Sequence, residues 1–246
     1  GNLNDKFEEI NLDNLDLKDL PELEKFMLNR VYSLNERFLK YFKNYDFHNL
    51  YKELLNFCTV DLSAFYFDIR KDTLYCDTLN SDKRKSCILV LNILLNSLLK
   101  WFAPILSFTT EEIYQLVSKK NKSIHLEKFQ DYPKKFKDEE LDKKWSELIK
   151  IRNICNISIE EKRASKEIGS SLEAEINVQL NNNYKKIIKD IDLSELCITS
   201  KAEIIYDDNV DIVISSKKAL GDKCPVCWKI RTNKCSREFC GLHKNA

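Results

Sequence analysis

The chain has 246 residues, of which 43% are hydrophobic and 32% charged, enough for one large domain or two to three small ones. A formal net charge of +1 excludes binding of nucleic acid through overall charge, so such affinity would need local basic patches. The low content of Gly and Pro, four of each, favours helices over turn-rich β architecture. The chain has no apolar run of about 18 residues, so we expect no membrane span.

The first half of the chain predicts amphipathic helices. Residues 1–20 are acidic and weakly periodic, which predicts an extended N-terminal segment. Pro21, a residue that the first helical turn tolerates, opens a helix that runs to about residue 45. A second helix is expected over about 47–69. A third, over about 81–102, is apolar around most of its circumference and should be the most buried helix of a bundle.

Two further helices complete the predicted bundle. Pro104 ends the third helix, and SFTTEEIYQLV starts the next one, with Thr109 and Glu112 at the spacing of a capping box. A long charged helix with an apolar stripe is expected over about 138–164.

The pattern changes at Gly169. The segment SLEAEINVQL alternates apolar and polar residues, which predicts a β-strand over 171–180. A short helix near 184–191 and strands within 197–206 and 210–215 would complete a small α/β unit.

These elements predict a mainly α protein in which a helical bundle precedes a small α/β unit and a C-terminal zinc knuckle. The expected parts are the N-terminal segment 1–20, a helical domain 21–168, an α/β domain 169–216 and a zinc-binding tail 217–246. Nine cysteines, an odd number spread along the chain, indicate a reducing compartment, and we expect a cytoplasmic protein. The chain does not begin with Met, so we expect a piece of a longer protein.

The tail contains a metal-ligand motif. Cys224 and Cys227 are separated by two residues, a spacing that presents two thiolates to one tetrahedral ion. The second pair is either Cys240 with His243, which we favour, or Cys240 with Cys235. A closed four-ligand site leaves no open position, so we expect one structural Zn²⁺ per chain that holds a tail too polar to fold alone. The alternative, scattered reduced thiols, is less consistent with this spacing.

The tail is also basic and aromatic. Residues 217–246 hold eight Lys or Arg against two acidic residues. Trp228 follows a metal ligand directly, with Lys229 and Arg231 beside it. Proteins that recognise single-stranded RNA typically bind its phosphates with Lys and Arg and stack an unpaired base on an aromatic ring. The competing interpretation is that Trp228 covers a small core beside the metal.

Four stretches of the chain are distinctive: NYDFHNLYKELLNFCTVDLSAFYFDIRKDTLYC, SDKRKSCILVLNILLNSLLKWFAPILSFTTEEIY, IRNICNISIEEKRASKEIGSSLEAEI and GDKCPVCW. They resemble bacterial-type isoleucyl-tRNA synthetases and follow that family's order over essentially the whole chain. Valyl- and leucyl-tRNA synthetases have a similar helical bundle. They lack the combination of the GSSLEA strand with a terminal cysteine knuckle. Two features depart from the family pattern: His243 stands where the family has a fourth Cys, and the loop between the knuckles is short.

The resemblance implies a C-terminal tRNA-binding portion, with an anticodon-binding helical domain and a zinc-binding tail. The implied partners are isoleucine tRNA and an upstream catalytic domain of the same polypeptide, in a monomer that binds no membrane. Basic residues of the long helix would lie against the anticodon stem: Arg152, Lys162, Arg163 and Lys166. The chain carries neither the His-x-Gly-His nor the Lys-Met-Ser-Lys-Ser motif of the family, nor its editing domain. We therefore expect no catalytic residues here and no isoleucine activation by this chain alone.

Two other functions remain open from the sequence. A stand-alone zinc-ribbon protein could bind nucleic acid in general, and a helical scaffold could dock other proteins. Formamidopyrimidine-type DNA glycosylases have a similar knuckle but need an N-terminal proline, whereas this chain begins Gly1-Asn2.

Overall fold

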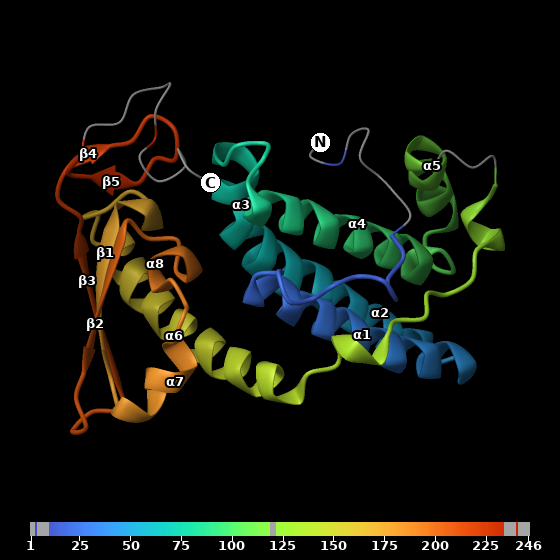
Figure 1. The fold of residues 1–246 in the computed structure, drawn as a ribbon, viewed down its shortest axis with the longest axis horizontal. Helices are drawn as coiled ribbons and strands as arrows, with labels where there is room; N and C mark the ends of the chain where they lie inside the picture. Colours follow the sequence, from blue (N-terminus) through green and yellow to red (C-terminus); the bar gives the residue numbers. More distant parts are fainter. Residues whose placement is uncertain (1–2, 4–9, 119–121, 234–239, 241–246) are drawn as a thin grey trace. The chain divides into compact units, whose positions relative to one another are not determined.

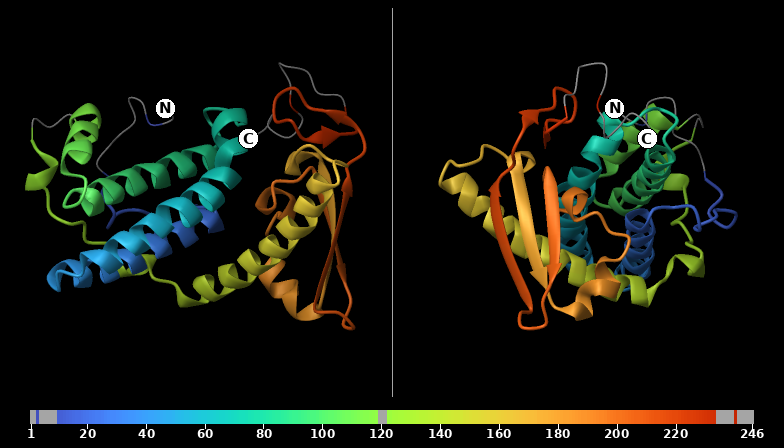
Figure 2. Two further views of the ribbon diagram at one scale, coloured as in Figure 1. Left: turned by 180° about the vertical axis from the view of Figure 1, so that it is seen from behind. Right: turned by 60° about the vertical axis from the view of Figure 1, so that its left-hand side comes forward.

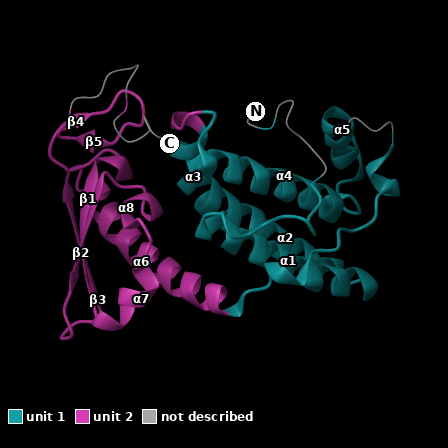
Figure 3. Ribbon diagram, viewed as in Figure 1, with its two compact units in different colours: residues 1–74, 79–139 teal, residues 75–78, 140–246 magenta. Residues whose placement is uncertain are grey.

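The structure is a computed structural model that describes residues 3, 10–118, 122–233 and 240. It divides into two compact units, which Figure 3 colours separately. Unit 1 comprises residues 1–74 and 79–139, and unit 2 comprises residues 75–78 and 140–246.

Unit 1 is the predicted helical bundle, and Figure 1 labels its α-helices. They are α1 (Glu22–Lys43), α2 (Phe47–Asn56), η1 (Phe57–Phe67), α3 (Asp68–Cys76), α4 (Asp82–Phe102), α5 (Ser107–Val117), η2 (Ile124–Leu126) and η3 (Lys134–Phe136).

Aromatic side chains fill the centre of the bundle. The ring of Trp101 on α4 meets that of Phe38 on α1 edge to face, with centroids 5.0 Å apart. Its indole Nε1 donates to Asn35 Oδ1 at 3.0 Å, so the buried polar end of this side chain has a partner. The apolar stripe predicted for the first helix therefore does face the core, and Met27 and Val31 are fully buried there.

The second predicted helix is longer than the sequence indicated. α2, η1 and α3 follow one another without interruption from Phe47 to Cys76, and η1 is π-helical. Near the start of η1 the hydroxyl of Thr59 donates to the carbonyl of Leu55 at 2.9 Å. Such bonds compete with the regular backbone pattern and commonly bend helices. The predicted end at residue 69 is therefore wrong by about two turns.

The next two helices were placed within a few residues. α4 begins where predicted because Ser81 caps it, accepting from Arg84 N at 3.3 Å. By length and composition alone α4 could cross a membrane, but its buried residues make it a core helix of unit 1. The predicted capping box is wrong: α5 starts after Leu106 without a side-chain cap, so Thr109 and Glu112 lie inside it.

Unit 2 consists of a long helix, a three-stranded sheet and a short hairpin. Its elements are α6 (Glu139–Ala164), η4 (Ser171–Glu173), β1 (Ala174–Leu180), η5 (Asn182–Tyr184), α7 (Lys185–Ile188), α8 (Leu193–Leu196), β2 (Lys201–Tyr206), β3 (Ile212–Lys218), β4 (Asp222–Lys223) and β5 (Ile230–Arg231). The sheet order is β2-β1-β3, with β1 parallel to β2 and antiparallel to β3.

One face of the sheet is covered by helices. Figures 1 and 2 show α6 and α8 on the same side of it. Ser158 on α6 and Ser216 on β3 are joined through their hydroxyls at 2.8 Å, and Arg152 Nε donates to the carbonyl of Leu196 on α8 at 2.9 Å. The first predicted strand is confirmed from Ala174 to Leu180, with its apolar residues buried, but the polar Glu175 is buried as well, and Leu172 lies in the preceding 3-10 turn.

The mainly α class, with a helical bundle before a small α/β unit, is confirmed. The boundary between the parts differs from the expected one at 168/169. Because α6 is bonded to β3 and α8, the structure groups residues 140–164 with the sheet.

Candidate metal and nucleic-acid site

The β4–β5 hairpin positions the first two cysteines of the tail. Cys224 N donates to Lys229 O at 2.8 Å, and Trp228 N donates to Cys224 O at 3.0 Å, which closes a tight turn around Cys227. Val226 N lies 3.4 Å from Cys224 Sγ and donates to it. The chain thus folds back so that both thiols face the same interior point, as the two-residue spacing predicted.

A third thiol joins them. Cys240 Sγ lies 3.7 Å from Cys224 Sγ and 3.6 Å from Cys227 Sγ, and all three residues are buried. Sulfurs at about 2.3 Å from a tetrahedral zinc ion would be separated by about 3.8 Å. The three thiols therefore already occupy what would be one face of a zinc coordination tetrahedron.

The environment distinguishes two of the thiols. Burial raises the pKa of Cys224, but N–H groups of Cys227 and Val226 and the neighbouring thiols lower it more, to about 7. Burial, followed by the neighbouring thiols, raises the pKa of Cys227 to about 12. Of these two thiols, Cys224 is therefore the readier to bind a cation as thiolate.

The donor set fits a soft divalent metal. Three clustered cysteines are brought together as predicted, and thiolates select zinc over hard cations such as Mg²⁺. The residues proposed for the fourth position, His243 and its alternative Cys235, both lie outside the part of the chain that the structure describes.

Trp228 stands at the surface of this hairpin. Its side chain is 60% exposed, and its backbone is held in the left-handed region at φ 63°. Lys223 Nζ lies 5.8 Å from the centroid of its ring, within the range of a cation–π contact. Of the two neighbouring cations, Lys229 is buried and Arg231 is half-buried on β5.

The four basic residues predicted on the long helix have different surroundings. Arg152 is 9% exposed and bonded to α8, which gives it a role in holding unit 2 together. Lys162 pairs with Glu167 at 3.0 Å and Arg163 with Glu160 at 2.6 Å. Among the described residues, Lys166 carries no ion pair, and it lies two residues after the end of α6 in the left-handed region at φ 61°.

Glu173 is a residue of this site that no sequence pattern indicated. Its Oε2 accepts from Gly169 N at 2.9 Å, and its Oε1 lies 3.8 Å from Nζ of Lys223, the cation beside Trp228. One carboxylate thus connects the loop after α6 with the hairpin. No local pattern marks it, because its partners are 4 residues before it and 50 residues after it.

Known proteins are similar to this chain along most of its length. The family described as the anticodon-binding domain of tRNA ligase matches residues 24–180. The isoleucine–tRNA ligase of Pelagibacter ubique is 67% identical over 96% of the chain, which covers 26% of that protein. Those of Agrobacterium fabrum and Bartonella quintana are each 37% identical, over 87% and 85% of the chain and 23% of each relative. The chain spans about a quarter of the length of these curated relatives.

Proposed function

Because the chain belongs to the family of anticodon-binding domains of tRNA ligases, we propose that it binds the anticodon stem-loop of isoleucine tRNA for an isoleucine–tRNA ligase. The structural feature that supports this proposal, in addition to the family match, is the β4–β5 hairpin of unit 2. Two buried thiols of this hairpin lie together with that of Cys240, and an exposed tryptophan with a lysine beside its ring directly follows Cys227.

Zinc is the metal we assign to the thiol cluster. Cys224, Cys227 and Cys240 would hold it with His243, and Cys235 is the alternative fourth ligand. A closed site of this kind supplies folding energy to a polar segment and takes no part in catalysis. Hydrogen bonds of the hairpin support this assignment, because they hold the thiols of Cys224 and Cys227 close together.

RNA contact is assigned to the exposed ring and to cations of unit 2. The proposed contact residues are Trp228, Lys229, Arg231, Arg152, Lys162, Arg163 and Lys166. An anticodon is a single-stranded loop, and such loops are recognised by stacking bases on aromatic rings while cations hold the backbone. Trp228 is the best-supported member, because its ring is exposed and its backbone is fixed by the bond to Cys224. Arg152 and Lys229 are the weakest members, because both are buried.

The remaining properties of the proposal are carried over from the sequence expectations. Isoleucylation with ATP would be performed by a catalytic domain that this chain does not contain, so the chain alone should activate no amino acid. We assign it to the cytoplasm as a monomer with no membrane partner.

The test is a binding titration of the zinc-loaded chain with several purified tRNAs at stated salt. We expect isoleucine tRNA to bind more tightly than tRNAs with other anticodons, and an isoleucine tRNA with an altered anticodon to lose that advantage. Equal binding of all tRNAs and of unrelated RNA would instead support a general nucleic-acid binder. No binding of any RNA would contradict the proposal.

A further inference from the structure

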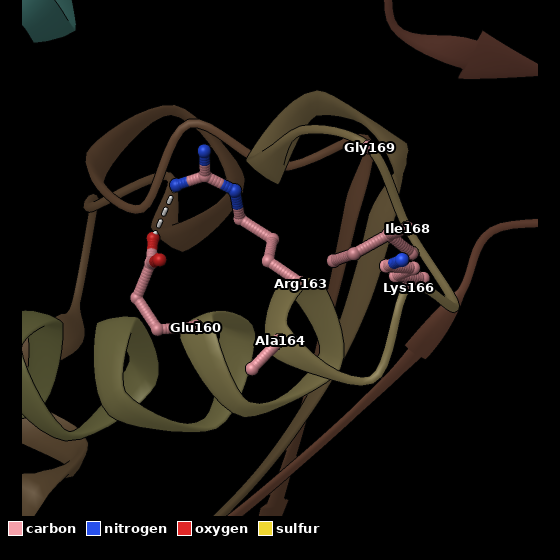
Figure 4. Close-up of a pocket in the computed structure, with 6 residues that line it drawn as sticks. All are labelled: Glu160, Arg163, Ala164, Lys166, Ile168 and Gly169. Carbon is pink, nitrogen blue, oxygen red and sulfur yellow. Dashed lines mark hydrogen bonds and ion pairs between the residues drawn. The ribbon is translucent and has the colours of Figure 1, made fainter.

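The end of α6 borders an open depression of about 510 Å³. Glu160, Arg163, Ala164, Lys166, Ile168 and Gly169 line it, and Figure 4 shows them. We infer that this depression binds one phosphate group of the RNA backbone, with Lys166 as the permanent cation and Arg163 as a second cation released from Glu160. The inference rests on the proposed function and names a site for it.

The charges of the depression favour an anion. It holds two cations against one carboxylate, and its other lining residues are small or apolar. Arg163 Nη1 contacts Glu160 Oε1 at 2.6 Å, but both side chains are roughly half exposed. Exposed pairs of this kind contribute little stability, so a phosphate can replace the Glu160 carboxylate at little cost. A guanidinium can then bind two phosphate oxygens at once.

Lys166 stands out among the cations of this helix end. Lys162, four residues earlier, is bonded to both carboxylate oxygens of Glu167 at 3.0 Å and does not line the depression. Lys166 has no such partner among the described residues. It also occupies a left-handed backbone position that favours glycine, so its side chain is not what stabilises the end of the helix.

A chain of polar contacts links the depression to the exposed tryptophan. Gly169, which lines the depression, donates its N–H to Glu173 at 2.9 Å. The other oxygen of Glu173 faces Lys223, whose ammonium lies beside the Trp228 ring. An RNA strand that stacks a base on Trp228 therefore has a cationic site for its backbone within the same unit.

The test measures tRNA affinity of the zinc-loaded chain as a function of salt for three variants. Lys166→Gly keeps the backbone conformation and removes only the cation. We expect affinity to fall about two- to fivefold, as for an exposed charge pair, and the slope of log affinity against log salt to lose about 0.7–0.9. Thermal unfolding should stay unchanged or rise slightly, because glycine suits this position.

Glu160→Gln and Glu167→Gln form a matched pair that changes net charge equally. Glu160→Gln frees Arg163 inside the depression and should tighten binding by a similar factor. Glu167→Gln frees Lys162 outside it and should have a smaller effect. Equal effects of the two, or a neutral Lys166→Gly, would overturn the inference while leaving the proposed function in place, provided that the unaltered chain binds tRNA. If the unaltered chain binds no RNA, both fail together.

Discussion

Arg70 donates from Nε and Nη2 to the two carboxylate oxygens of Glu24, each at 2.6 Å, and both side chains are almost fully buried. The pair joins α3 to α1 across 46 residues of sequence. The hydroxyl of Tyr66 completes it, donating to Glu24 Oε1 at 3.3 Å. Burial, followed by the charge of Glu24, raises the pKa of this phenol well above its usual value, so Tyr66 remains a donor at physiological pH.

Removal of one partner of this pair should strongly destabilise unit 1. Glu24→Ala leaves the buried guanidinium without its carboxylate, and we expect a loss of about 3–5 kcal/mol in the free energy of unfolding. The double variant Glu24→Leu, Arg70→Met should recover much of that loss, because two apolar side chains need no partner. Urea unfolding followed by helical circular dichroism measures both. A loss below about 1 kcal/mol for Glu24→Ala, the value of an exposed pair, would contradict the structure.

The purified chain should contain about one equivalent of zinc, because a site with four ligands of this type takes one tetrahedral ion. Removal by a chelator should abolish the hairpin but leave most of the helical signal, since the bundle has its own core. His243→Ala should lower zinc affinity more than Cys235→Ala. Elemental analysis and chelator competition test these statements. The reverse order would make Cys235 the fourth ligand, and no uptake by the chain would exclude the site.

Gly221→Ala should disrupt the hairpin and weaken zinc binding. Gly221 has φ +127°, and a Cβ there would lie 2.2 Å from the carbonyl oxygen of Arg231. The backbone conformation alone should cost about 1–3 kcal/mol, and the clash adds to it. Gly169→Ala is the matched control, because its Cβ would meet Glu173 Oε1 at an ordinary 3.5 Å. Similar zinc affinity of the two variants would show that the hairpin geometry is wrong.

Trp228→Ala should weaken binding of isoleucine tRNA by about 1–3 kcal/mol, the contribution of one base–aromatic stack, and leave the salt slope almost unchanged. Trp228→Phe should retain part of the affinity. Trp101 and Trp145 are buried, so quenching of tryptophan fluorescence by a soluble quencher reports mainly Trp228 and should fall when tRNA binds. If Trp228→Ala releases zinc, or leaves tRNA affinity untouched, the ring is a structural residue and the stacking assignment is wrong.

The sequence alone was sufficient for features that depend on local patterns. Helix periodicity located α1, α4 and α6 to within about two residues, and strict alternation located β1. The two-residue spacing of Cys224 and Cys227 predicted a tight turn that presents both thiols. The family resemblance, carried by ordered stretches of sequence, is confirmed by the anticodon-binding match to residues 24–180.

Only the tertiary structure decided what distant residues do to one another. Periodicity could not pair Glu24 with Arg70. Nor could it separate Lys162, which is bonded to the carboxylate of Glu167, from Lys166, which carries no ion pair within the described part of the chain. The sequence does not show whether a basic side chain is buried, ion-paired or exposed and free to bind a ligand. Its state depends on the atoms that folding places around it, and those come from elements far apart in the chain. The same reason explains why Glu173, which joins the end of α6 to the hairpin, had no signal in the sequence.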